Sequence, residues 1–508
     1  MTADLSTVAV SVLLVAPLLA GWLSLLLRTS RTLHLVNLTS MGALVAAESA
    51  IARTVLGQGP LLTFGEMVYI DALSMVILFI IGTVGLACSF YMRAYMDDQV
   101  ARGVIAASRL NLFFFLFHMF LLAMVVATVA NSLGVQWVAI EATTLATTFL
   151  IAFWRRRESL EAGWKYLILC SVGISLALFG VVLTYYSSLR VLGDVSRALQ
   201  VTQLQLIADQ LDPHILKLAF VFLFVGYGTK VGLAPMHSWL PDAYSEAPAP
   251  VAAMLAGVLE TVAVYAILRS RAIVDQAVSP DFSGGLLTLF GLGSFALATF
   301  FILLQHNYKR LFAYSSIEHM GLAMVGFGVG GAVGTFGGLF HLVNHAFAKS
   351  LAFFAAGNIH RRFKTVEMEQ VQGLASAQPW SAFALLVAGF SLAALPPFAL
   401  FTSELQIVTA LGTDGLPGGW PFSGTKLPLL LLLACGLVAF AGLLFRVTGM
   451  VWGTPAREIA RGEGWSVGHI PIIVLGAVLI WFCMTLPDPF RHLLDGAVKI
   501  LLSTRGAA

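Results

Sequence analysis

The stretch GTKVGLAPMHSWLPDA, from Gly228 to Ala243, is decisive for the fold of this chain. It closes an apolar run with a lysine, Lys230, and follows that lysine five residues later with Pro235. Proline lacks the backbone N–H that a helix interior needs, so the helix that carries Lys230 is expected to break here. A charge next to a helix break, both inside an apolar segment, requires a functional explanation.

The composition of the whole chain places this stretch in a membrane protein. The 508 residues are 58% hydrophobic and only 11% charged, with a mean hydropathy of +0.88. A soluble globular chain has about 25% charged residues, and a large buried core does not explain such a deficit. Apolar runs of about 20 residues, enough for a helix to cross roughly 30 Å of hydrocarbon, recur along the sequence. The sequence therefore predicts an all-α polytopic membrane protein.

We expect about fourteen transmembrane helices. The predicted spans are 8–27, 33–51, 71–91, 110–130, 133–153, 165–186, 215–235, 248–268, 285–304, 311–330, 334–358, 380–411, 427–447 and 470–486. The first run lacks the basic flank of a signal peptide, so we interpret it as a helix. The chain would then divide into an N-terminal part (1–109), two five-helix units (110–268 and 285–447) and a last helix with an amphipathic interfacial tail (470–508).

The placement of lysine and arginine predicts the orientation in the membrane. Most of the 29 basic residues fall in loops that follow odd-numbered spans, as in the run Arg155–Arg157. These loops are predicted to face the cytoplasm, and both termini the opposite side of a bacterial-type inner membrane. Arg269 and Arg271 are expected in a loop on that opposite side.

Seven of the ionisable residues inside predicted spans form the candidate site. An ionisable group at membrane depth is costly, so by default it marks an ion or proton path. The seven are Glu141, Lys230, Glu260, His341, His345, Lys349 and Glu404. Three of them, His341, His345 and Lys349, have i, i+4, i+8 spacing and therefore follow one face of a helix.

Each of these residues also has a structural interpretation. A single glutamate could be protonated and hydrogen-bonded to a neighbouring helix, and Lys230 could extend to the membrane surface. His341 and His345 have the spacing of a helical zinc pair, but there is no HExxH glutamate and no evident third ligand, so no metal is predicted. The cysteines lie singly in apolar runs, which indicates neither an iron–sulfur cluster nor a disulfide framework. They are Cys88, Cys170, Cys435 and Cys483.

A second helix break is expected at Pro396 and Pro397, in the middle of the twelfth span. Glu404 follows it by seven residues. A broken helix is tolerated in a membrane where protein or a water-filled cavity satisfies the freed backbone groups. Two breaks at comparable positions of two halves are typical of transporters with inverted repeats. The two five-helix units are therefore predicted to be such repeats.

Four blocks of the sequence resemble the antiporter-like membrane subunits of respiratory complex I, of Mrp-type Na+/H+ antiporters and of membrane-bound hydrogenases. The blocks are KVGLAPMHSWLPDAYSEAPAPVAAMLAGVLETVAVYAILR, NYKRLFAYSSIEHMG, HLVNHAFAKSLAFFAAGNI and PPFALFTSELQIV. The segments SSIEHMG and SEAPAPV within these blocks are most similar to the hydrogenase-associated branch of the family, of the component F type. The resemblance runs from about the third to the thirteenth span.

This resemblance implies fourteen helices, inverted repeats and a coupled pair formed by Glu141 and Lys230. It also implies a central axis containing His341, His345 and Lys349, and an exit residue, Glu404, on the second broken helix. One position departs from the family, because Glu260 stands where the complex I members often have lysine or histidine. An acid can still relay protons, but the charge balance of the axis would differ.

Three functions remain open on the sequence alone. The first is a proton-translocating subunit of a redox-driven complex, complex I-like or hydrogenase-like, with other membrane and peripheral subunits as partners. The second is a subunit that exchanges Na+ for H+, and the third is the proton-conducting part of an inorganic-carbon uptake system with a carbonic-anhydrase-like partner. A membrane scaffold is disfavoured by the buried charges. No cofactor is predicted, because the sequence has no nucleotide-binding glycine motif or haem-ligand pair.

Overall fold

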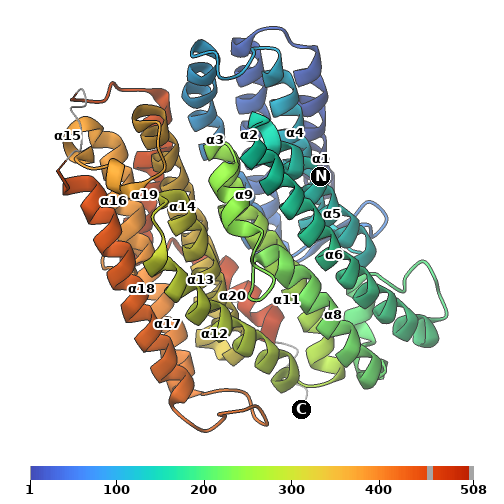
Figure 1. Ribbon diagram of the computed structural model, residues 1–508. Helices are drawn as coiled ribbons and strands as arrows, with labels where there is room; N and C mark the ends of the chain where they lie inside the picture. Colours follow the sequence, from blue (N-terminus) through green and yellow to red (C-terminus); the bar gives the residue numbers. More distant parts are fainter. Residues whose placement is uncertain (1, 455–460, 503–508) are drawn as a thin grey trace.

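The computed structural model describes residues 2–454 and 461–502, which form a bundle of long helices (Figure 1). The first half contains α1 (Thr2–Leu26), α2 (Ser30–Gln58), α3 (Ala72–Ala101), α4 (Arg109–Val129), α5 (Leu133–Ile151), α6 (Arg157–Leu192), α7 (Val201–Leu206), α8 (Pro213–Val231), α9 (Leu240–Glu246), α10 (Ala249–Met254) and α11 (Glu260–Ala277). The second half contains α12 (Pro280–Leu304), α13 (Tyr308–Val329), α14 (Gly331–Phe363), α15 (Leu374–Ala377), α16 (Pro379–Leu392), α17 (Ala399–Thr413), α18 (Leu427–Trp452), α19 (Ile470–Met484) and α20 (Asp488–Leu502).

Eleven helices of the described residues are long and apolar enough to cross a membrane. Three predicted spans fall outside that set for identifiable reasons. The helix α13 includes Lys309, Arg310, Glu318 and His319, and α14 contains three histidines, a lysine and two arginines, so their mean hydropathy is low. The twelfth predicted span is divided into α16 and α17, each of which is too short to cross alone. The polytopic helical membrane fold is confirmed.

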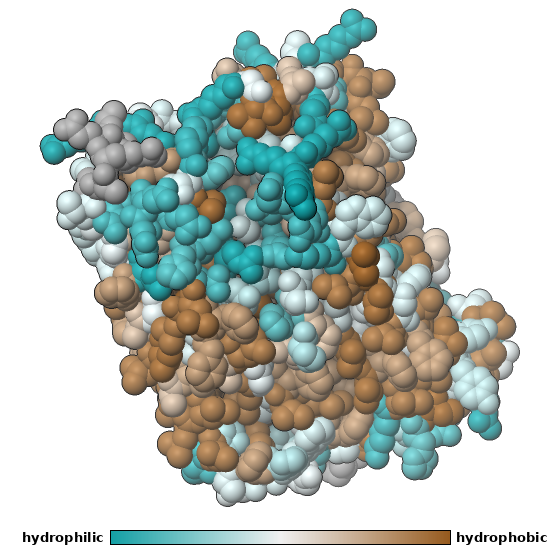
Figure 2. Space-filling model, viewed as in Figure 1, coloured by the Kyte–Doolittle hydropathy of each residue, from teal (hydrophilic) through white to brown (hydrophobic). Residues whose placement is uncertain are grey.

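The outer surface fits a lipid environment. Figure 2 shows a broad hydrophobic band over the sides of the helices, with hydrophilic residues gathered at the end of the molecule where α15 lies. The one departure from an all-helical chain within the described residues is a short hairpin of β1 (Leu61–Thr63) and β2 (Val68–Ile70). Its strands pair antiparallel, with Leu62 opposite Tyr69.

The centre of the bundle is formed by α14 and by the segment from α10 to α11. A π-helical turn, Leu255–Leu259, joins α10 to α11 and ends directly before Glu260. Such turns often occur at functional sites because they re-aim the side chains that follow. Gly257 lets this turn approach α14 closely, since a Cβ atom there would lie 2.9 Å from the carbonyl oxygen of Ala346. The contact brings Glu260 into the vicinity of α14.

The first helix break matches the predicted one. The helix α8 ends at Val231, and Gly232 follows in the left-handed conformation (φ = 85°), which glycine adopts without a steric penalty. The chain stays non-helical through Pro235 until α9. Trp239 Nε1 donates to the carbonyl oxygen of Thr229 at 2.8 Å, so an acceptor at the open helix end is satisfied inside the protein.

The second break separates α16 from α17, and Pro396 and Pro397 lie within it. The carbonyl oxygen of Leu392, at the end of α16, lies 3.1 Å from Nε2 of His319 on α13. A carbonyl can only accept, so this histidine nitrogen is the donor. The break thus fixes the orientation of a buried histidine.

The prediction that Arg269 and Arg271 lie in a loop is wrong. The helix α11 continues to Ala277, and both arginines are buried within it. Arg269 binds Asp71 with both guanidinium NH groups, and Nη1 lies 2.6 Å from Oδ2 of Asp71. Arg271 Nε lies 3.0 Å from Oδ2 of Asp275. Each arginine can be buried because a carboxylate compensates its charge. Hydropathy along the chain does not reveal such a pairing.

Candidate functional site

Lys230 is fully buried in the last turn of α8, and its hydrogen bonds lead to Glu141. Its Nζ donates to Oγ1 of Thr144 at 2.8 Å and to the hydroxyl of Tyr166 at 2.6 Å. Thr144 Oγ1 in turn donates to Oε2 of Glu141 at 3.0 Å, and Ser171 Oγ donates to Oε1 at 2.9 Å. The pair that the resemblance implies is therefore connected through one threonine hydroxyl.

Two features favour a charged Lys230 in this position. The carbonyl ends of α8 carry the negative end of the helix dipole, which stabilises a cation in the last turn. The carboxylate of Glu141 supplies the opposite charge beyond Thr144. Glu141 itself is half-buried on α5, whereas Thr144 and Tyr166 are fully buried. The lysine charge is therefore held by groups from three helices, α5, α6 and α8.

Aromatic residues connect Lys230 with Glu260. The ring of Trp239 lies 5.0 Å from that of Tyr166 and 6.0 Å from that of Tyr244, between centroids. The hydroxyl of Tyr244 donates to Oε1 of Glu260 at 2.6 Å. The second oxygen of Glu260 has no hydrogen-bond partner among the described residues.

Lys349 on α14 is the next buried charge after Glu260. Its Nζ donates to the carbonyl oxygen of Phe312 at 2.8 Å and interacts electrostatically with the carboxylates of Glu260 and Glu318. All three ionisable groups are buried. One cation between two acids limits the cost of placing such groups in a membrane interior.

The histidines predicted on α14 meet a third histidine on α13. Nδ1 of His319 lies 3.1 Å from Nε2 of His341 and 3.6 Å from Oε1 of Glu404. His345 lies beside them, with its ring centroid 5.3 Å from that of His319. We call His319, His341, His345 and Glu404 the histidine cluster. His319, His341 and Glu404 bring one ligand atom each within 4.8 Å of one another, which is compatible with a metal ion.

The structure brings the seven predicted residues into one series, which we call the polar axis. In order, it contains Glu141, Lys230, Glu260, Lys349, His345, His341 and Glu404, together with Thr144, Tyr166, Tyr244, Glu318 and His319. The last five were not singled out from the sequence. Glu318 and His319 carry the signal that marked the other seven, since both lie inside the predicted span 311–330. The hydroxyl groups carry no such signal, because threonine and tyrosine are common in membrane helices.

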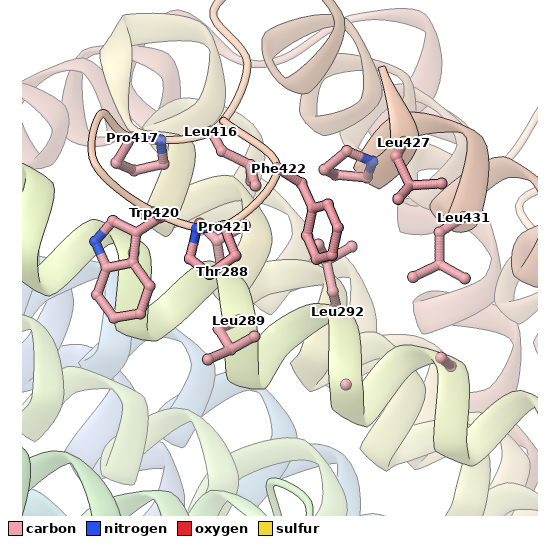
Figure 3. Close-up of a pocket in the computed structure, with 14 residues that line it drawn as sticks. Thr288, Leu289, Leu292, Leu416, Pro417, Trp420, Pro421, Phe422, Leu427 and Leu431 are labelled. Atoms are coloured by element: carbon pink, nitrogen blue, oxygen red, sulfur yellow. The ribbon is translucent and has the colours of Figure 1, made fainter. Parts of the chain in front are cut away.

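Two pockets lie outside the polar axis, and the second of them borders its Glu404 end. A pocket of about 260 Å³ between α12, α18 and the loop before α18 is lined by apolar residues such as Leu292, Phe422 and Leu431 (Figure 3). None of its lining residues is ionisable, so it is not part of the polar axis. A more open pocket of about 570 Å³ is lined by residues that include Thr402, Gln406 and Asp495. This pocket borders α17, the helix of Glu404.

Comparison with known proteins assigns the family. Residues 130–422 match the family described as NADH:quinone oxidoreductase/Mrp antiporter, transmembrane. A hydrogenase-4 component F homolog from Methylacidiphilum infernorum (isolate V4) is 36% identical over 429 residues, which cover 84% of this chain and 87% of the relative. The predicted resemblance is thereby confirmed.

Solved structures agree with this assignment. A chain of the membrane-bound sulfane sulfur reductase, an archaeal respiratory membrane complex, superposes with a TM-score of 0.84 at 22% identity, over 98% of each chain. A chain of respiratory complex I from Thermus thermophilus with bound aureothin superposes with a TM-score of 0.72 at 25% identity, over 95% of this chain and 97% of that one. Both are subunits of multi-subunit membrane complexes. The chain belongs to the NADH:quinone oxidoreductase/Mrp antiporter family and is an antiporter-like membrane subunit.

Proposed function

We propose that this chain is the proton-translocating subunit of a redox-driven membrane complex, either hydrogenase-like or complex I-like. The observation that carries the proposal is the polar axis, in which ionisable groups follow one another from Glu141 to Glu404, half-buried at its two ends and buried between them. A membrane scaffold has no need of such groups, each of which is costly at membrane depth. The partners would be other membrane and peripheral subunits, which hold the redox centres.

The membrane topology that fits this function has fourteen crossings. We infer that α13 and α14 cross as well, and that α16 with α17 forms one broken crossing, in the same way as α8 with α9. The two breaks then occupy comparable positions in two inverted five-helix repeats, residues 110–268 and 285–447. Both termini would face away from the cytoplasm, because the arginine-rich loops face it.

The first step of the mechanism is electrostatic. While Glu141 is charged, its carboxylate and the end of α8 hold the ammonium of Lys230. If a neighbouring subunit neutralises Glu141 or draws it away, the buried ammonium loses its counter-charge, which costs several kcal/mol. The proton then leaves Lys230 toward Glu260, past Tyr166, Trp239 and Tyr244.

The second half of the axis takes the proton to the other side. Glu260 and Glu318 flank Lys349, so a proton that arrives on Glu260 removes one of the two charges that hold the Lys349 ammonium. Its proton then passes to the histidines, whose two ring nitrogens can accept on one side and donate on the other. Glu404 is the last group of the series and lies on the helix that borders the open pocket. We propose it as the exit residue.

The transported ion can be tested in proteoliposomes that contain the complex purified through a tag on this chain. We expect the redox reaction of the complex to change the internal pH at the same rate in Na+-free buffer and in 100 mM NaCl, because nitrogen-rich groups bind protons rather than Na+. A protonophore should collapse the signal. A rate that requires Na+ would instead support Na+/H+ exchange.

A further inference from the structure

The three ligand groups of His319, His341 and Glu404 come from three different helices, α13, α14 and α17. The i, i+4 spacing in the sequence indicated His341 and His345 as a possible ligand pair. In the structure, the histidine whose ligand atom groups with that of His341 is His319, on another helix. The two nitrogen atoms that face each other, Nδ1 of His319 and Nε2 of His341, are 3.1 Å apart. Glu404 Oε1 lies 3.6 Å from the same Nδ1.

A hydrogen-bond partner lies at the far side of each ring. Nε2 of His319 donates to the carbonyl oxygen of Leu392. Ser403 Oγ lies 2.9 Å from the carbonyl oxygen of Leu400 and 3.0 Å from Nδ1 of His341, so it accepts from Nδ1 in the tautomer of His341 in which its own proton goes to Leu400. In that tautomer both ring protons are on the outer nitrogens, which leaves the two inner nitrogens free to bind a cation.

The two inner nitrogens then face each other with their lone pairs across 3.1 Å, whereas in the other tautomer Nε2 of His341 donates to Nδ1 of His319. Two lone pairs at this distance repel unless a cation lies between them. A shared proton is one such cation, and a transition-metal ion is another. The neighbouring carboxylate of Glu404 would compensate the charge of either.

The distances fit a metal ion of the zinc type. Ligand atoms at 2.0–2.1 Å from a tetrahedral Zn2+ are about 3.3 Å apart. The two pairs that include Nδ1 of His319 are 3.1 and 3.6 Å apart, and all three ligand atoms lie within 4.8 Å of one another. Metal-bound histidines almost always donate their other N–H to a backbone carbonyl or another fixed acceptor. His319 does so to the carbonyl oxygen of Leu392, and Nδ1 of His341 lies 3.0 Å from Oγ of Ser403, which can accept from it.

We propose that His319, His341 and Glu404 form a binding site for one zinc-type transition-metal ion. Two imidazoles and a carboxylate suit Zn2+, whereas Mg2+ and Ca2+ prefer oxygen ligands. Three protein ligands leave a fourth position for water or for His345. Both nitrogens of His345 are buried without a hydrogen-bond partner in the part of the chain that the structure describes.

A metal ion at this position would occupy the place of the transported proton and tie α13, α14 and α17 together. It would thus block the exit half of the polar axis. Binding itself needs no proton transport, so it can be measured even if the proposed function fails. The open pocket gives an approach to this region, because Phe340 and Thr402, the chain neighbours of His341 and Ser403, line it.

The test is a Zn2+ titration of the purified complex against a chromophoric chelator, with wild type and His319→Gln, Glu404→Gln and Ser403→Ala variants. We expect the wild-type complex to bind one Zn2+ ion and the His319→Gln and Glu404→Gln variants to lose this binding. Ser403→Ala should weaken it about 10- to 100-fold, the usual effect of removing a hydrogen-bond partner of a metal-bound histidine. His118→Gln is the matched control. His118 is buried on α4 and unpartnered among the described residues, and this variant should bind Zn2+ like wild type.

X-ray absorption of the zinc-loaded wild-type complex supplies a readout that does not depend on any variant. We expect a spectrum with at least two imidazole nitrogens and one oxygen at about 2.0–2.1 Å. Unchanged Zn2+ binding in both His319→Gln and Glu404→Gln would overturn the site. Wild type that binds no Zn2+, or a spectrum without imidazole, would overturn it equally.

Discussion

Replacement of His319 by leucine is expected to reduce redox-driven proton translocation by about 100-fold or more, the usual contribution of a positioned proton-transfer group. The ring of His319 contacts those of both His341 and His345, with centroids 5.1 and 5.3 Å away, and its Nδ1 lies 3.6 Å from Oε1 of Glu404. Leucine has no group that carries a proton and leaves the carbonyl oxygen of Leu392 without its donor. Acidification of proteoliposomes that contain the assembled complex measures the effect.

Two further variants separate proton transfer from a structural role of His319. His319→Gln can still donate an N–H to Leu392, but it does not accept and release a proton, so it should be as inactive as the leucine variant. His118→Leu introduces the same change at a buried histidine of α4, outside the polar axis, and should keep the wild-type rate. If the His319→Gln complex translocates protons at the wild-type rate, the role of His319 is structural and it does not carry the proton.

Replacement of Arg269 by alanine is expected to destabilise the protein by about 3–5 kcal/mol, the usual effect of leaving a buried charge unpaired. Arg269 and Asp71 are fully buried, and the carboxylate also accepts the backbone N–H of Ser74 at the start of α3. Arg269→Ala therefore leaves an uncompensated charge at a helix terminus. The measurement is the melting temperature of the detergent-solubilised chain, followed by tryptophan fluorescence.

The control for this prediction is the exposed pair of Arg197 and Asp194, 3.8 Å apart. Arg197→Ala should leave the melting temperature unchanged, because water already solvates both charges. The double variant Asp71→Asn/Arg269→Gln removes both charges and keeps an oxygen for Ser74, so it should melt above Arg269→Ala. Equal melting temperatures for wild type and Arg269→Ala would contradict the importance of this ion pair.

Much of the fold is predictable because its signals are local. Apolar runs give the positions of the helices, and the prolines at 235, 396 and 397 give both interruptions. The charges in α11 are the exception. A hydropathy profile assigns Arg269 and Arg271 to a loop, because it does not show their carboxylate partners. These partners are Asp71 at the start of α3 and Asp275 one turn further along α11.

The candidate site is predictable residue by residue but not as an arrangement. A charged residue in an apolar segment is visible in the sequence, and this signal marks all seven predicted positions. Which of them meet depends on packing between helices far apart in the chain, as the meeting of His319 with His341 shows. The hydroxyl of Thr144, which connects Lys230 to Glu141, is likewise recognised only after α5 and α8 are placed together.

Translocation through the polar axis is tested most directly by the number of protons that the assembled complex moves per redox turnover when Lys230 is replaced by methionine. Lys217→Met, an exposed lysine on the same helix, is the control. We expect the Lys230→Met complex to assemble and to lose the protons that this chain carries, while Lys217→Met keeps the wild-type number. A wild-type number of protons per turnover with Lys230→Met would contradict a proton path through this chain.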